Sequence, residues 1–137
     1  MSELLKKSQS NKDAAQLLYD KFLFAPSVHC SYYSFLQAAQ DFINSTLEIN
    51  NEQLIKKHST KAARATTHAA IRNELSDIIR KRLRYRAPLF QKKVQMLVQR
   101  RIDSDYTQVP IGYSEANCAK SESEELKEIL IELKKVL

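Results

Sequence analysis

The sequence predicts an all-α protein, and its composition gives three reasons. The 137 residues include one glycine and three prolines, and they contain no Asn-Gly or Asp-Gly dipeptide of the kind that closes β-hairpins. Good helix formers such as Leu, Lys, Glu, Gln and Ala are abundant. Apolar residues make up 43% and charged residues 28%, so the chain can form a core and is not typical of disordered proteins. We expect a single helical domain over residues 1–137.

Two helices are predicted over residues 13–24 and 26–47. The first has apolar residues on one side at helical spacing, namely Ala14, Leu17, Leu18 and Phe22. Pro26 separates the two helices, because proline disfavours helix at the preceding residue and suits a first turn. The second helix has a broad apolar face, formed by Tyr32, Phe35, Leu36, Ala39, Phe42, Ile43 and Leu47. We expect this helix at the centre of the fold.

Three further helices are predicted in the rest of the chain. One covers residues 53–83, with an interruption near Ser59-Thr60 or Thr66-Thr67, and Pro88 stops it. The next covers residues 89–102 and is followed by an irregular connection, DSDYTQVPIGY. Ser114 is the predicted N-cap of the last helix, whose Glu-rich start and Lys-rich end match the helix dipole.

Several classes of site lack their motifs in this sequence. The only glycine is Gly112, so neither a P-loop nor a dinucleotide-binding fingerprint is present, and we expect no cofactor. The three histidines are not spaced for a metal site, and we expect no metal. Cys30 and Cys118 lie far apart without a CxxC pattern, which favours free or buried thiols. Without a long apolar run or a signal-peptide pattern, a cytoplasmic protein with no membrane association is expected.

Positive charge is concentrated in the middle of the chain. Residues 56–101 hold 14 basic and 2 acidic residues, a net +12, whereas residues 1–55 carry −2 and residues 102–137 carry −4. In the stretch IIRKRLRYR, Arg80, Arg82 and Arg84 could contact phosphates and Tyr85 could stack on a base. The alternative is a solvated helix end whose cations favour the C-terminal dipole.

Other polar residues allow two interpretations each. His68 and Arg72 lie one helical turn apart, so both could face one anionic group, or they could be a buried histidine beside a surface arginine. The Tyr32-Tyr33 pair is expected in the core.

The stretch RRIDSDYTQVP, residues 100–110, also allows a functional and a structural interpretation. An arginine at a helix end beside an aspartate is oriented for bidentate phosphate recognition. Alternatively, Asp103 or Asp105 neutralises Arg100 or Arg101 and only fixes the connection, which is the interpretation that composition favours.

Three stretches together resemble the HEPN family, small helical domains named for nucleotide binding in higher eukaryotes and prokaryotes. APSVHCSYYSFLQAAQDFIN resembles the family helix with a Tyr-Tyr pair, THAAIRNEL its His-containing segment, and VQRRIDSDY the branch with Arg, three residues and Asp-Tyr. The resemblance covers residues 13–137, where the core is expected. It implies a four- or five-helix, largely antiparallel up-and-down bundle, usually a homodimer and often paired with a nucleotidyltransferase antitoxin.

The chain departs from the family at one catalytic position. Active members resemble metal-independent ribonucleases, whose site is Arg, four to six residues, then His. Counted from Arg101, those positions hold Tyr106, Thr107 and Gln108, and no histidine follows His68.

We therefore predict an RNA- or nucleotide-associated HEPN-like module in a toxin–antitoxin or defence setting. In this prediction Arg101 contacts phosphate, Asp105 orients it, and Tyr106 adds a hydrogen bond or stacking. The polyanion is attracted by four more arginines, Arg72, Arg80, Arg82 and Arg84. One alternative is a metal-independent ribonuclease that uses Arg101 with Tyr106, Asp105 or His68. Another is a non-catalytic, protein-binding or structural dimer whose basic segment meets an acidic partner.

Overall fold

The computed structural model describes all 137 residues and contains six α-helices. They are α1 (Glu3–Asp20), α2 (Phe24–Asp41), α3 (Asn51–His58), α4 (Thr67–Arg82), α5 (Ala87–Tyr106) and α6 (Tyr113–Lys135). A π-helical turn (Phe42–Thr46) extends α2, and a 3-10 turn (Arg84–Arg86) precedes α5. The predicted all-α class is confirmed, but the helices number six rather than four or five. None of them is long and apolar enough to cross a membrane.

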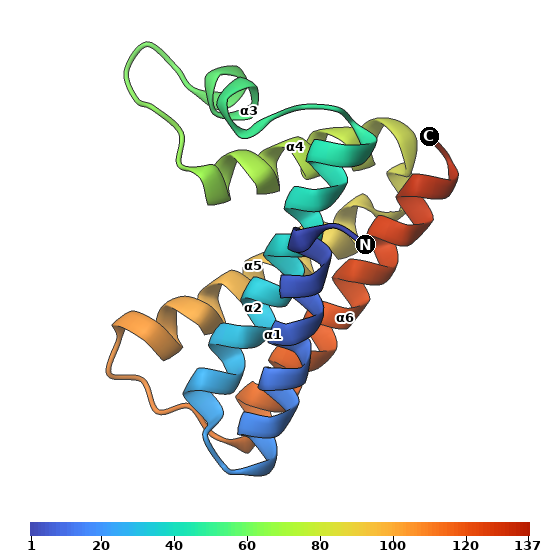
Figure 1. Cartoon of the computed structure of the whole chain (residues 1–137). Helices are drawn as coiled ribbons and strands as arrows, with labels where there is room; N and C mark the ends of the chain where they lie inside the picture. The colour runs from blue at the N-terminus through green and yellow to red at the C-terminus, as the bar shows by residue number, and fades with distance from the viewer.

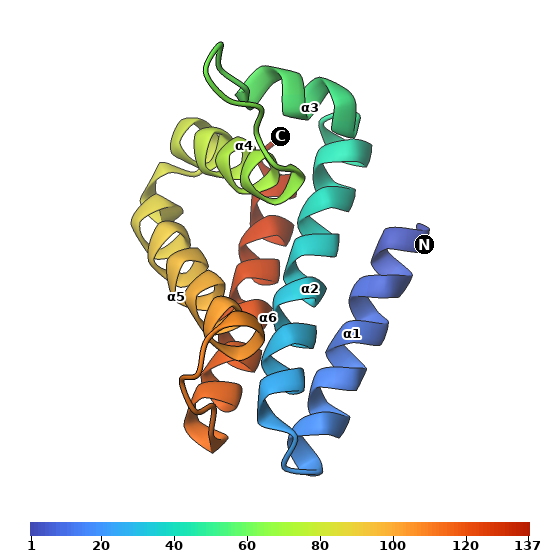
Figure 2. The same ribbon diagram turned by 90° about the vertical axis from the view of Figure 1, so that its left-hand side faces the viewer.

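Four long helices, α1, α2, α5 and α6, lie alongside one another, and α3 and α4 pack across one end of them (Figures 1 and 2). Helix α2 is central, because it packs against α1, α5 and α6 and also contacts α4. Helix α4 also packs against α5, and α3 packs on α4. Residues of α2, α4 and α5 can therefore share one site.

The core follows the apolar face that the sequence predicts for α2. Its largest fully buried side chains are Tyr32, Phe35, Phe90, Ile43, Leu54, Ile71, Leu75, Ile79, Leu97, Leu126, Leu133 and Val28. The expectation for the first helix was wrong, since Leu17 is 61% exposed and Phe22 is 78% exposed. Phe22 occupies the turn between α1 and α2 with φ 62°, a left-handed conformation that is rare for a bulky residue.

Helix α1 begins ten residues before its predicted start at residue 13. The Ser2 hydroxyl caps it by accepting a hydrogen bond from the Leu5 amide at 3.1 Å. Buried Ser8 donates to the Ser34 carbonyl at 2.6 Å. Because Ser8 is small and polar, the spacing of apolar residues does not reveal that this part of α1 packs on α2. The predicted start of the helix was therefore too late.

The predicted helix over residues 53–83 is divided, and both suggested interruptions occur. Helix α3 ends before Ser59, and the Thr66 hydroxyl caps α4 by accepting from the Ala69 amide at 3.2 Å. Pro88 lies in the first turn of α5, where a missing amide hydrogen costs nothing. Helix α6 begins next to Gly112, whose amide donates to Glu115 at 2.9 Å, so Ser114 is not the N-cap.

Candidate functional site

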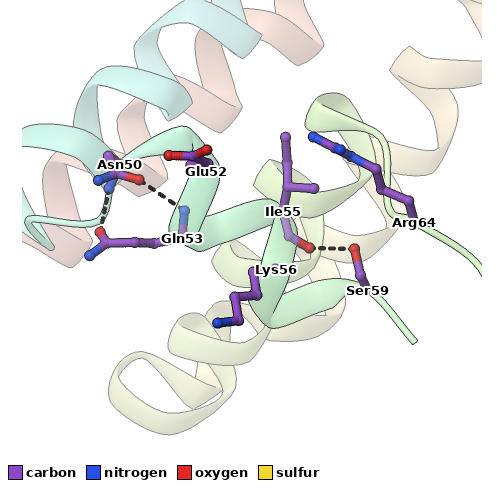
Figure 3. Close-up of a pocket in the computed structure, with 7 residues that line it drawn as sticks. All are labelled: Asn50, Glu52, Gln53, Ile55, Lys56, Ser59 and Arg64. Carbon is purple, nitrogen blue, oxygen red and sulfur yellow. Dashed lines mark hydrogen bonds between the residues drawn. The ribbon is translucent and has the colours of Figure 1, made fainter. Parts of the chain in front are cut away.

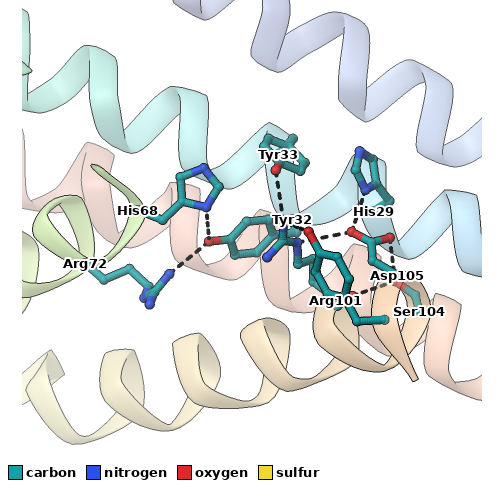
Figure 4. Close-up of polar contacts among 9 residues, drawn as sticks. His29, Tyr32, Tyr33, His68, Arg72, Arg101, Ser104 and Asp105 are labelled. Atoms are coloured by element: carbon teal, nitrogen blue, oxygen red, sulfur yellow. Dashed lines mark hydrogen bonds and ion pairs between the residues drawn. The ribbon is translucent and has the colours of Figure 1, made fainter. Parts of the chain in front are cut away.

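Arg101 is the centre of a polar cluster formed by α2, α4 and α5 (Figure 4). Helix α5 continues to Tyr106, so Asp105 lies one turn beyond Arg101 instead of in a loop. Arg101 Nε makes an ion pair with Asp105 Oδ2 at 3.1 Å. Arg101 Nη2 donates to the hydroxyls of Tyr33 and Tyr106, each at 3.2 Å. The structure thus brings together the predicted trio of Arg101, Asp105 and Tyr106.

Aromatic rings surround the guanidinium on several sides. Arg101 Cζ lies 5.4 Å from the ring centroid of Tyr32, 5.7 Å from that of Tyr33 and 5.1 Å from that of Tyr106. These distances are within the range of cation–π attraction. The Arg101 side chain is 17% exposed, whereas Tyr106 is 71% exposed. The guanidinium is therefore held in one orientation, and Tyr106 marks its solvent side.

His29 of α2 belongs to the same cluster, although the sequence pattern did not identify it. Its Nδ1 lies 2.8 Å from Asp105 Oδ2, the oxygen that also pairs with Arg101. Its ring packs against Tyr33 with centroids 4.7 Å apart. The available signal was the spacing of His29 and Tyr33, which are four residues apart and share a helix face.

Tyr32 connects this cluster to α4. Its hydroxyl accepts a hydrogen bond from Arg72 Nη1 at 3.0 Å and lies 3.4 Å from His68 Nδ1. Burial, together with the nearby charges of Arg101 and Arg72, lowers the pKa of His68. Burial also raises the pKa of Tyr32, in spite of Arg72. Tyr32 is a core residue as expected, whereas half-buried Tyr33 turns its hydroxyl to Arg101.

No family model, curated protein or solved structure significantly matches this chain. What the cluster can bind therefore follows from its own geometry and chemistry.

The neighbouring Arg100 is oriented differently. Its Nε donates to both carboxylate oxygens of buried Glu122 on α6, at 2.8 and 3.1 Å. Burial raises the pKa of Glu122, although Arg100 opposes this. Asp103 pairs with neither arginine and accepts from Gln99 at 3.0 Å. Of the two arginines, Arg100 forms the structural ion pair with α6, and Arg101 forms the polar cluster with α2 and α4.

A groove of about 510 Å³ between α4 and α5 starts at Arg72. Its lining is almost entirely polar and consists of His58, Arg72, Asn73, Ser76, Asp77, Arg80, Gln91, Val94 and Gln95. Because Arg72 also bonds to Tyr32, the groove continues from the Arg101 cluster. Arg80 is in the groove but forms an ion pair with Asp77.

Other basic residues differ in whether they form ion pairs. Arg86 in the turn before α5, and Lys93 and Arg100 on α5, pair with Glu132, Glu125 and Glu122 of α6. Arg82 and Arg84 are exposed at the far end of α4 and in the following turn, and neither makes an ion pair. Arg82 is 14 residues from His68 along one helix, or about 20 Å. These two arginines are therefore separate from the Arg101 cluster.

Two other polar features are internally satisfied. His58, Glu74 and Asp77 place ligand atoms within 4.8 Å of one another, but the Glu74 oxygens already accept from Lys57 at 2.8 Å and His58 at 2.7 Å. A hollow of about 640 Å³ lies beside α3. Figure 3 shows its lining residues, among them Asn50 and Gln53, which form a capping box. Neither feature contacts the Arg101 cluster.

Proposed function

We propose that this chain is an RNA-binding helical module, similar to HEPN domains, that holds a backbone phosphate at Arg101. The observation that carries the proposal is the oriented guanidinium, held by Asp105 and by two tyrosine hydroxyls at the surface end of α5. The residues on which the family resemblance rests are far apart in the sequence. Their proximity in one cluster, with His68 on α4 and the tyrosine pair on α2, supports the proposal.

The cluster offers a phosphate several unused hydrogen-bond donors. Arg101 Nη2 donates to the two tyrosine hydroxyls, buried Nε makes only the ion pair with Asp105, and Nη1 makes no hydrogen bond in the chain. Tyr33 and Tyr106 accept hydrogen bonds from Arg101, so their own hydroxyl hydrogens remain available. Hydrogen bonds from a charged arginine to phosphate are about twice as strong as those between neutral groups.

The groove between α4 and α5 can hold the part of the RNA strand that follows the bound phosphate. Arg72 and Arg80 lie eight residues apart on α4, or about 12 Å along the helix axis. Between them the amides of Asn73, Gln91 and Gln95 line the groove and can bond to base edges. Exposed Tyr106 offers a face on which an unpaired base can stack. Single-stranded RNA fits these features better than a duplex, because a duplex does not expose its base faces.

The two alternatives from the sequence receive less support. The ribonuclease alternative needs His68 or Asp105 to accept a proton, but His68 directs Nδ1 at the Tyr32 hydroxyl and Asp105 is already paired with Arg101. The dimer alternative needs the acidic helix of a second copy, but the acidic residues of α6 already form ion pairs with α5 and the turn before it in the same chain. Homodimerisation, a nucleotidyltransferase partner and a toxin–antitoxin or defence setting remain predictions from the family resemblance.

The test is binding of a fluorescently labelled, mixed-sequence single-stranded RNA in EDTA, followed by anisotropy. Arg101→Ala should weaken binding by about tenfold or more, as expected for the loss of a charged hydrogen bond. The control is Arg64→Ala, which removes an equal charge from an exposed residue outside the cluster. Equal affinities of wild type and Arg101→Ala would contradict the proposal.

A further inference from the structure

His29 combines an oriented ring nitrogen with an unpaired one. Nδ1 contacts Asp105 Oδ2 at 2.8 Å, while Nε2 makes no hydrogen bond in the chain and the side chain is 45% exposed. When Nδ1 carries the hydrogen and donates it to the carboxylate, Nε2 of the neutral ring presents a lone pair to solvent. A carboxylate that fixes an imidazole in this way is the arrangement found in acid–base catalysis.

His29 is also close to the proposed phosphate site. Arg101 Nε and His29 Nδ1 contact the same carboxylate oxygen at 3.1 and 2.8 Å, so the two nitrogens are at most 5.9 Å apart. Figure 4 shows His29, Tyr33 and His68 in a row on the α2 and α4 side of Arg101. A phosphate on Arg101 would place its neighbouring ribose within reach of this row.

We infer that His29 is the general base of a metal-independent RNA-cleaving site, taking the place of the histidine that is missing from the segment after Arg101. This inference rests on the proposed function, because it requires RNA to be held at Arg101. His29 differs from the residues considered earlier in having a free ring nitrogen at the surface.

The reaction is an internal transesterification. Nε2 of His29 takes the proton of a ribose 2′-hydroxyl while the 2′-oxygen forms a bond to phosphorus. The P–O5′ bond breaks, the 5′-oxygen takes a proton from water, and the imidazolium neutralises the hydroxide that is left. The products are a 2′,3′-cyclic phosphate end and a 5′-hydroxyl end. Arg101 and the hydroxyl of Tyr33 stabilise the extra negative charge on the phosphoryl oxygens.

The experiment measures cleavage and binding separately, using purified full-length chain in EDTA. Cleavage is followed with a mixed-sequence RNA whose new ends are analysed for cyclic phosphate. Binding is followed with the same sequence carrying 2′-O-methyl groups, which cannot be cleaved by this reaction. We expect wild type to cleave and His29→Gln to lose about 100-fold or more in rate, the usual contribution of a general base. The dissociation constant for the methylated RNA should change by less than about threefold.

Two further variants test the role of the imidazole itself. His29→Ala should regain part of its rate when imidazole is added, because the free base can enter the vacated surface position. The control is Lys7→Gln on α1, which changes an exposed residue outside both the cluster and the groove and should cleave like wild type. Thermal melting of each variant shows whether it is folded.

The possible results separate the two proposals. Wild type that binds methylated RNA but does not cleave RNA would overturn the role of His29 and leave the binding function intact. A His29→Gln variant that cleaves at the wild-type rate, or that loses binding and cleavage equally, would also overturn it. Wild type that neither binds nor cleaves would overturn both proposals.

Discussion

Arg100 and Glu122 form a two-bonded ion pair between α5 and α6, with Nε at 2.8 and 3.1 Å from the two carboxylate oxygens. The next residue, Arg101, points to α2 and contacts Tyr33. Adjacent residues on a helix are rotated by about 100°, so one arginine faces the α5–α6 contact and the other the cluster. Two neighbouring positions of the same amino acid therefore have separable roles.

Arg100→Ala should lower the free energy of unfolding by about 3 kcal/mol, because it leaves the buried carboxylate of Glu122 without its partner. RNA affinity of the folded variant should stay within about twofold of wild type. Urea denaturation and anisotropy measure the two quantities. If Arg100→Ala weakens RNA binding as much as Arg101→Ala does, the assignment of separate roles is wrong.

Tyr32→Phe and Tyr33→Phe should also differ. Removing the hydroxyl of fully buried Tyr32 leaves Arg72 without its acceptor and should cost about 1 to 2 kcal/mol of stability. Removing the hydroxyl of half-buried Tyr33 deletes one hydrogen-bond partner of Arg101. This change should weaken RNA binding about fivefold, with little loss of stability. Chemical denaturation and RNA titration of both variants check this, and a reversed pattern would contradict it.

The exposed arginines at the end of α4 should contribute through salt-dependent attraction. For single strands, each phosphate contact adds about 0.7 to the slope of log affinity against log salt, so Arg82→Ala with Arg84→Ala should reduce it by about 1.4. The control is Lys7→Ala with Lys21→Ala, which removes the same charge from α1 and the turn after it, across α2 from the groove (Figure 2). Equal slopes for both double variants would show that the attraction comes only from net charge.

Two buried glutamates should give opposite pH dependence. Burial acts to raise the pKa of Glu74, but hydrogen bonds from Lys57 and His58 outweigh it and the pKa is lowered. Its stabilising contribution is therefore present above the pKa of an unfolded glutamate and is lost as the pH falls through the lowered value. The stability difference between wild type and Glu74→Gln should shrink as the pH falls from about 5 to about 3.

For Glu122 the pKa shift, and therefore the pH dependence of stability, has the opposite direction. Burial raises its pKa despite Arg100, so its contribution is present at low pH and is lost as the pH rises through the raised value. Relative to Glu122→Gln, wild type should lose stability as the pH rises from about 4 toward neutrality. Thermal melts of both variants at a series of pH values provide the measurement, and parallel curves would contradict the assigned directions.

The sequence was sufficient for features that depend on local pattern. The single glycine and the absence of hairpin dipeptides predicted the all-α class, and three- and four-residue spacing identified the buried face of α2 around Phe35 and Ile43. The interruption suggested near Thr66 occurs, and the Thr66 hydroxyl caps α4, a position that threonine commonly occupies. Arg101, Asp105 and Tyr106 could be grouped because they are close in the chain.

Other features depended on contacts between distant segments. The DSDY residues were predicted to be irregular, since Asp and Ser are poor helix formers, yet α5 continues through them, supported by the Arg101–Asp105 pair one turn apart. His29 and Asp105 are 76 residues apart and meet only because α2 packs against α5. The separation of Arg100 from Arg101 likewise required α6 to bring Glu122 to one side of α5. Periodicity determined which faces are buried, and helix packing decided which polar side chains meet.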